Sequence, residues 1–235
     1  MNISTKALPA LSKDVPFGTK AHDLIAALPL IVWYTLAVIG QIRPLSTQFA
    51  ATDLAHPQLA IVMAILSKLA ALLLAMLLIV FLLIRPPAKA GAHGLLPRVI
   101  ALLGTYLGVG IALLPQRHAS TWLLSLSTLM AVGGMSFAVY SVLWLGRSFS
   151  LMPEARRLVT GGPYSVIRHP LYVGEGLPMI GFVIANFSGL AFALLVLLMC
   201  CQLCRMHYEE EVLTATFPDY AQYKMRTFRL LPGVY

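Results

Sequence analysis

One apolar region, Leu171–Cys204, constrains the fold of this chain more than any other part of the sequence. Its 34 residues include only one that is charged at neutral pH, Glu175. As a single helix the region would be about 51 Å long at about 1.5 Å per residue, whereas the hydrocarbon core of a bilayer is about 30 Å thick. The cluster Asn186-Phe187-Ser188-Gly189 has the composition of a turn and divides the region into two helices of about 15 residues each. We therefore expect a helical hairpin in the membrane.

The rest of the chain is also strongly apolar, with 59% hydrophobic and 11% charged residues overall. A soluble domain carries about 25% charged residues. A membrane-spanning helix needs roughly 17–25 apolar residues. Four further runs are long enough: Leu24–Ile42, Leu59–Ile84, Val99–Pro115 and Thr121–Gly146. The sequence thus predicts an all-α, polytopic membrane helical bundle of about six segments, of which the last two form the hairpin.

The positive charges of the chain are spread between these apolar runs. The net charge of +8 could indicate nucleic-acid binding, but the basic residues form neither a continuous patch nor a tail, so we expect no nucleic-acid partner. Connections rich in Lys and Arg alternate with connections that have one or none, which is the pattern of a multi-pass membrane protein. With six segments, this alternation predicts that both termini are cytoplasmic.

Two polar stretches flank the hairpin, and the turn at residues 186–189 would bring them to the same membrane face. In the first, Arg168-His169-Pro170 predicts a corner at the start of a helix, because proline is favoured there and disfavours helix at the residue before it. In the second, Arg205 and Glu209 are four residues apart and share a helix face. Glu175 lies at membrane depth, where an ionisable side chain is costly and usually functional.

Each of these features also has a simpler interpretation. The acidic triplet Glu209–Glu211 is also typical of a solvated helix end, and Tyr164 and Tyr172 of aromatic residues at the membrane interface. The Cys201-x-x-Cys204 pair favours packing. The spacing of the histidines and glutamates is common by chance, so we expect no metal site, and there is no GxGxxG motif of a dinucleotide-binding domain.

Taken together, the motifs resemble those of the isoprenylcysteine carboxyl methyltransferase family and the wider phospholipid-methyltransferase-like membrane enzymes. The first motif is Leu158-Val159-Thr160-x-Gly162-Pro163-Tyr164, followed by Arg168-His169-Pro170-x-Tyr172. The second is Arg205-x-x-x-Glu209-Glu210-x-x-Leu213-x-x-x-Phe217 with Tyr220 and Tyr223. The resemblance covers about residues 140–232. One departure is Pro218, which stands where the family often has glycine.

The resemblance implies a helical bundle whose C-terminal part binds S-adenosylmethionine near the cytoplasmic face, while a lipophilic or prenylated substrate arrives from the bilayer. Arg205 would hold the substrate carboxylate, with Arg168 as the second catalytic residue and Glu175 on the substrate side. Glu154 would be a further cofactor contact. The implied cofactor-binding residues are Leu158, Val159, Tyr164, His169, Pro170, Leu171, Tyr172 and Glu209.

These observations predict three parts of the chain. Residues 1–22 would be a cytoplasmic N-terminal segment, and residues 23–146 would form four transmembrane helices. Residues 147–235 would be the catalytic part, with the cofactor motifs, the hairpin and C-terminal helices. Its last membrane helix would continue to about Thr216, and a further helix would start after Pro218.

The expected function is S-adenosylmethionine-dependent methyl transfer in the membrane, with carboxyl O-methylation as the leading reaction. Phospholipid N-methylation and thiol S-methylation stay open within that class. A membrane NAD(P)H-dependent reductase of the sterol type is the rival enzyme, with Arg156 and Arg157 as candidate ligands of the 2′-phosphate. A non-enzymatic membrane scaffold is the third possibility.

Overall fold

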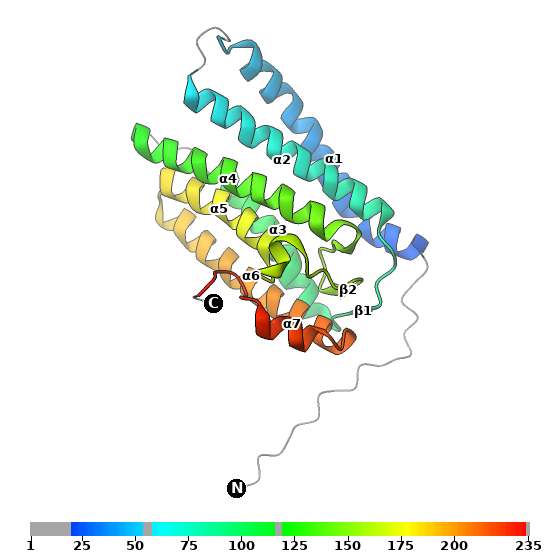
Figure 1. The fold of residues 1–235 in the computed structure, drawn as a ribbon. Coiled ribbons are helices and arrows are strands. Elements are labelled where there is room, and N and C mark those ends of the chain that lie inside the picture. Colours follow the sequence, from blue (N-terminus) through cyan, green and yellow to red (C-terminus); the bar gives the residue numbers. More distant parts are fainter. Residues whose placement is uncertain (1–19, 54–57, 116–118, 234–235) are drawn as a thin grey trace.

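A computed structural model describes residues 20–53, 58–115 and 119–233, and it shows an almost entirely helical protein (Figure 1). The expected N-terminal segment, residues 1–22, falls mostly outside the described residues. Within them, five helices are long and apolar enough to cross a membrane, and α5 is a shorter apolar helix. The predicted all-α membrane bundle is therefore confirmed. The helices are α1 (Lys20–Ala50), α2 (Leu59–Ile84), α3 (Leu95–Ala112), α4 (Thr121–Leu145), α5 (Pro170–Ala185), α6 (Gly189–Thr216) and α7 (Tyr220–Arg226).

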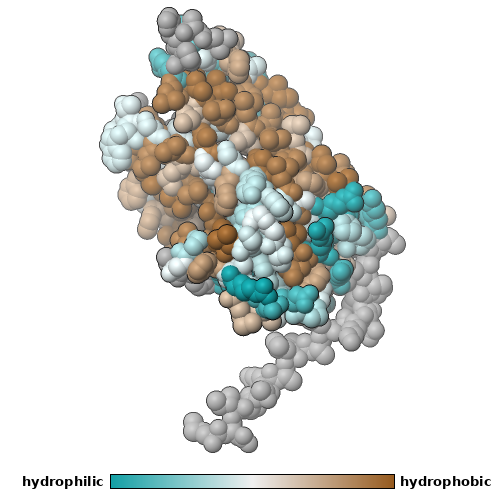
Figure 2. All heavy atoms as spheres, viewed as in Figure 1, coloured by the Kyte–Doolittle hydropathy of each residue, from teal (hydrophilic) through white to brown (hydrophobic). Residues whose placement is uncertain are grey.

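The helices pack in an order that differs from their order in the chain. α2 lies between α1 and α4, α4 packs along α5, and α3 packs against α6 (Figure 1). The start of α1, the loop before α5 and α7 lie at one end of the bundle, and the turn between α5 and α6 lies at the other (Figure 1). Hydrophilic residues gather at the end that carries α7, and hydrophobic residues cover most of the remaining visible surface (Figure 2).

The predicted hairpin is present as α5 and α6, with the turn at the expected place. Ser188 is the N-cap of α6, because its hydroxyl accepts a hydrogen bond from the backbone N–H of Ala191 at 3.1 Å. α5 has 16 residues, about 24 Å, which is shorter than a bilayer core of about 30 Å. α6 has 28 residues and ends at Thr216 as predicted, so it carries the second polar stretch to the α7 end.

The ends of two helices differ from the apolar runs that predicted them. The first helix continues to Ala50, beyond the expected end at Ile42 and past Pro44. The third begins at Leu95, before the expected Val99, and ends at Ala112. The predictions stopped at charged or polar residues, whereas a membrane helix can extend beyond the apolar part of the bilayer.

Glycines set the position of α5 against α4. A Cβ atom on Gly174 would lie 2.6 Å from the backbone nitrogen of Ala138, and one on Gly134 would lie 2.6 Å from Cδ of Pro178. Both distances are too short for any side chain. Small residues let helix backbones approach closely in membranes. The start of α5 therefore has a fixed position along α4.

Sequence reasoning did not find the short sheet at the polar end. Strand β1 (Ala90–Gly91) pairs antiparallel with β2 (Glu154–Ala155). Beside it, Asp23 at the start of α1 accepts from Arg85 at 2.8 Å and from Arg156 at 2.6 Å. These contacts fasten the loop between α4 and α5 to the first two helices.

Candidate active site

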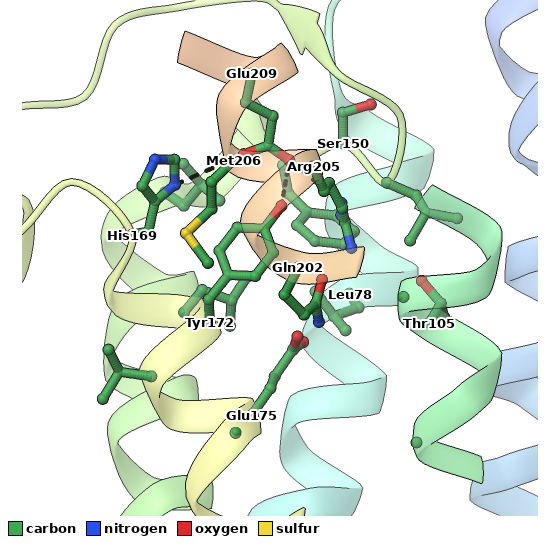
Figure 3. A pocket seen from close by; sticks show the side chains of 18 of the residues that line it. Leu78, Thr105, Ser150, His169, Tyr172, Glu175, Gln202, Arg205, Met206 and Glu209 are labelled. Atoms are coloured by element: carbon green, nitrogen blue, oxygen red, sulfur yellow. Dashed lines mark hydrogen bonds and ion pairs between the residues drawn. The ribbon is translucent and has the colours of Figure 1, made fainter. Parts of the chain in front are cut away.

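A cavity of about 770 Å³ runs from the polar end of the bundle into its apolar interior (Figure 3). Its walls come from α1 to α6, and its polar end is covered by residues 148–159 and by α7. Small-molecule sites are typically clefts of about 300–1,000 Å³ with mostly apolar walls and a few polar groups. The cavity is therefore large enough for a cofactor together with part of a second molecule.

The segment that follows α7 holds the corner at the start of α5. The backbone N–H of Arg168 donates to the carbonyl of Phe228 at 2.8 Å, and the N–H of Phe228 donates to the carbonyl of Val166 at 3.0 Å. His169 donates in the same way to Arg229 at 3.2 Å. Pro170 then begins α5. The predicted corner thus depends on residues near the C-terminus that lie outside both motifs.

Glu210 is the centre of the charged cluster under this corner. Its carboxylate lies 2.9 Å from Nε of Arg168 and 3.1 Å from Nε2 of His169. Arg229 and Lys224 approach it at 3.2 and 3.3 Å. The side chain of Glu210 is only 6% exposed. One buried carboxylate therefore connects α6, the start of α5 and the segment that follows α7.

Glu209 faces the cavity and connects α5 with α6. The hydroxyl of Tyr172 donates to its carboxylate, and Nε of Arg205 lies 3.3 Å from the same oxygen. The Arg205 guanidinium stacks 5.1 Å from the centre of the Tyr172 ring. Nδ1 of His169 lies 3.8 Å from Glu209. These residues form a polar layer across the cavity, which we call the upper layer (Figure 3).

The two predicted motifs therefore meet at one cavity. Among the predicted residues, those that line it are Leu158, Val159, Tyr164, Arg168, His169, Leu171, Tyr172, Glu175, Arg205 and Glu209, together with Glu154. Pro170 is buried at the start of α5 but does not line the cavity in the described chain. Their chemical roles remain predictions.

Arg168 is held differently from what its predicted catalytic role suggests. Besides Glu210, its guanidinium donates to the carbonyl of Lys224 at 3.1 Å and to that of Thr227. These partners lie in the C-terminal part of the chain. The geometry thus favours a role for Arg168 in positioning the corner.

Burial keeps the tyrosines at the polar end in their neutral form. Burial is the main reason that the pKa of Tyr164 is raised, with the charge of Glu209 acting in the same direction. Burial also raises the pKa of Tyr223 to about 12. A protonated Tyr223 donates to the backbone carbonyl of Tyr164 at 2.7 Å. The phenol of Tyr223 therefore ties α7 to the first motif.

Several residues at this site were not identified from the sequence. Tyr34, Thr105 and Gln202 line the cavity from helices whose sequence is mainly apolar, so no local pattern marks them. Glu210 belongs to the predicted acidic triplet, but the sequence alone does not show which glutamate faces the cavity. One residue of an α-helix is a rotation of about 100°, and it turns Glu210 toward the charged cluster and Glu209 toward the cavity.

Comparison with protein families points to the part of the chain that carries both motifs. Residues 117–219 match the family described as phospholipid methyltransferase, and they contain the hairpin and most of both motifs. Over this stretch the chain is similar to that family, which confirms the resemblance seen in the motifs.

Two bacterial relatives can be named. The chain is 32% identical over 124 residues to the cobalt-zinc-cadmium resistance protein CzcN of Cupriavidus metallidurans, covering 50% of this chain and 54% of the relative. It is 29% identical over 119 residues to the nickel-cobalt-cadmium resistance protein NccN of Alcaligenes xylosoxydans xylosoxydans, covering 48% and 53%. The chain thus spans about half the length of the curated relatives it matches.

Proposed function

We propose that this protein is an integral membrane methyltransferase that uses S-adenosylmethionine and modifies a lipophilic acceptor, with carboxyl O-methylation as its reaction. One observation carries the proposal: a single cavity joins the two motifs at the polar end to the apolar interior, and a buried arginine, Arg205, lies where the two regions meet. A water-soluble cofactor and a membrane-borne acceptor can approach such a cavity from opposite ends.

The polar end of the cavity fits S-adenosylmethionine. Tyr164 and Tyr172 supply aromatic surface, which favours a positively charged group. Glu209 is a carboxylate that can accept hydrogen bonds from an amino group or from ribose hydroxyls. Leu158 and Val159 provide an apolar wall beside it. These residues are the candidates for holding the cofactor.

The position of Arg205 supports a carboxylate as the acceptor group. Its side chain is 7% exposed, and it stacks on Tyr172, which fixes the plane of the guanidinium. A guanidinium can bind a carboxylate through two parallel hydrogen bonds. Glu209 engages Nε at 3.3 Å, so the terminal nitrogens of Arg205 are the groups that would hold the acceptor.

The residues of the cavity need to supply orientation more than acid or base catalysis. When bound, S-adenosylmethionine supplies a methyl group on a positively charged sulfur, and its transfer to a carboxylate oxygen gives an ester and a neutral thioether with no proton to move. Arg205 would align the acceptor oxygen, and the apolar walls would exclude water. Alignment and desolvation are both recognised sources of rate enhancement.

The rival reductase is less well supported. Arg156, one of its two candidate ligands for a 2′-phosphate, has a side chain that is 0% exposed. Its guanidinium contacts Asp23 and Glu154 and donates to the carbonyl of Pro86.

Phospholipid N-methylation is the second candidate reaction, because the matched family is described as phospholipid methyltransferase.

The polar end of the bundle would face the cytoplasm, where S-adenosylmethionine is made, and both termini would then be cytoplasmic. The alternation of basic residues and the position of the cofactor motifs support this orientation.

The proposal is tested with the purified protein in lipid nanodiscs. We expect S-adenosylmethionine, and not NADPH, to raise the unfolding temperature. Incubation with methyl-labelled S-adenosylmethionine and a membrane lipid extract should then give a labelled, base-labile ester, detected by mass spectrometry. Stabilisation by NADPH alone would contradict the proposal, and a base-stable labelled product would replace carboxyl methylation by N- or S-methylation.

A further inference from the structure

A second polar layer lies deeper in the cavity, and no prediction from the motifs explains it. Glu175 follows Tyr172 by three residues on α5, and Gln202 precedes Arg205 by three residues on α6. Because the two helices run in opposite directions, each step leads about 4.5 Å further into the apolar interior. In Figure 3 the side chains of Glu175 and Gln202 point into the space below the upper layer. We call this pair the lower layer.

Both side chains of the lower layer have unused hydrogen-bonding capacity. Within the described chain, Glu175 has no hydrogen-bond or ion-pair partner, although it lines the cavity. Gln202 is 9% exposed, and its Oε1 is buried without a hydrogen-bond partner among the described residues. A half-buried carboxylate and a buried amide are costly when they are left unpaired. A molecule bound in the cavity can supply a partner for Glu175 and for the amide NH2 group of Gln202.

Gly104 of α3 makes room for the lower layer. A Cβ atom on Gly104 would lie 2.9 Å from Oε1 of Gln202. The amide of Gln202 therefore packs against the backbone of α3, which limits its movement. The amide nitrogen of Gln202 is on the side of the cavity and of Glu175 (Figure 3).

We propose that Glu175 and Gln202 recognise an amide group next to the carboxylate of the acceptor. The inference rests on the proposed carboxyl methylation. In its ionised form Glu175 repels a second carboxylate and accepts strongly from an N–H donor. Gln202 carries both a donor and an acceptor, so it can pair with the carbonyl of the same amide. The lower layer thus offers complementary partners for both polar atoms of a secondary amide.

The order of the layers along the cavity defines the class of acceptor. From the polar end inward, the cavity presents Arg205 and then the lower layer, which lies beside Leu78 of α2. Further inward, its apolar walls include Leu74 and Ala71 of the same helix. A matching molecule carries a carboxylate, an amide N–H a few bonds away and a long apolar chain beyond it. An N-acylated amino acid has these groups in this order, whereas a simple fatty acid has no N–H.

The test compares two probes that differ at one atom, N-decanoylglycine and N-decanoylsarcosine, in which the amide nitrogen carries hydrogen or methyl. Methyl transfer is measured for the full-length protein in nanodiscs, below the micelle-forming concentration of each probe. We expect kcat/KM for N-decanoylglycine to be about 10-fold higher or more, because a charge-assisted hydrogen bond is lost with the sarcosine probe.

Variants then assign this preference to the lower layer. Glu175→Leu and Gln202→Leu should reduce it to about threefold or less, and Glu175→Gln should keep part of it because a glutamine oxygen still accepts a hydrogen bond. The matched control is Glu211→Gln, since Glu211 is on the same helix as Gln202 but is 55% exposed. It should keep the full preference. Cofactor affinity, measured separately, should be unchanged in all four variants.

The other outcomes separate this inference from the proposed function. Equal activity of the wild type on both probes would overturn the inference and leave methyl transfer intact. Weaker cofactor binding in Glu175→Leu with an unchanged preference would assign Glu175 to the positive charge of the cofactor, which also overturns it. Methylation of decylamine and of neither carboxylate would overturn both the inference and carboxyl methylation. Failure of the wild type to bind S-adenosylmethionine would overturn the proposed function and the inference with it.

Discussion

Arg168 and Glu210 are 42 residues apart in the chain and form a buried ion pair, with Nε of Arg168 2.9 Å from Oε1 of Glu210. The contact joins the corner at the start of α5 to α6, the helix that carries the second motif. Because Lys224 and Arg229 also approach Glu210, the same carboxylate holds the C-terminal part of the chain over the cavity.

The first prediction concerns this carboxylate. Glu210→Ala removes the carboxylate that pairs with the largely buried Arg168, and breaking a buried pair in this way costs about 3–5 kcal/mol. We expect a large drop in the unfolding temperature, or cleavage near α7 by limited proteolysis at temperatures where the wild type is intact. Glu211→Ala is the control, because its pair with His207 is exposed and such pairs contribute about 0–1 kcal/mol. Equal stability of the two variants would show that Glu210 is not the centre of the cluster.

The second prediction concerns the packing of α4 on α5. Gly174→Ala would place a methyl group 2.6 Å from the backbone nitrogen of Ala138, and overpacking of this kind costs about 1–3 kcal/mol. Gly133→Ala, on α4, meets nothing within 4 Å and removes a helix-destabilising glycine. We expect the first variant to unfold at a lower temperature than the wild type and the second to be as stable or slightly more stable. The reverse order would contradict the close approach of the two helices.

Much of the fold could be predicted because hydrophobic length and turn composition are local properties of the sequence. The split at Asn186–Ser188 and the end of α6 at Thr216 depend on such local signals. The β1–β2 pair and the contact of Asp23 with Arg156 depend on residues more than 60 positions apart. No local pattern encodes pairings of that kind.

In the candidate site, too, local spacing could be predicted from the sequence and contacts between distant residues could not. Arg205 and Glu209 could be paired from their spacing on one helix. Glu210 could not be separated from its two neighbours, because its partners come from the start of α5 and from the segment that follows α7. Gln202 lies in a run that reads as membrane helix, and its contribution is visible only once Gly104 of α3 is placed against it.

The third prediction concerns the cofactor. Glu209→Ala removes a carboxylate that faces the cavity, and a hydrogen bond to a charged group contributes about 1.5–3 kcal/mol. We expect the affinity for S-adenosylmethionine to fall by about 10- to 100-fold in isothermal titration calorimetry. Glu211→Ala again serves as the control and should bind as the wild type does. Unchanged affinity in a folded Glu209→Ala protein would remove Glu209 from the cofactor site.

The fourth prediction concerns topology. If the α7 end faces the cytoplasm, a cysteine at Ser188, in the turn at the opposite end of the bundle, is reached by a membrane-impermeant thiol reagent only from the non-cytoplasmic side. The native cysteines on α6 are first replaced by serine. A cysteine at Thr227, after α7, should react only from the cytoplasmic side. Labelling of both positions from one side would contradict the six-segment arrangement.

The last prediction separates binding of the acceptor from binding of the cofactor. Arg205→Lys keeps the positive charge but loses the planar guanidinium that stacks on Tyr172 and can hold a carboxylate with two hydrogen bonds. We expect cofactor affinity to stay within about threefold of wild type, while methyl transfer falls by about 10- to 100-fold, equivalent to about 1.4–2.7 kcal/mol of transition-state stabilisation. Arg205→Ala should lower methyl transfer further, because no positive charge remains to hold the acceptor. If Arg205 serves only as the partner of Glu209, the Arg205→Lys variant should have the turnover of the wild type, and the Arg205→Ala variant should lose cofactor affinity. If the acceptor is an amine, removal of the charge should leave turnover unchanged or increase it. Measuring turnover and cofactor affinity for both variants therefore distinguishes a carboxylate-binding arginine from a structural one.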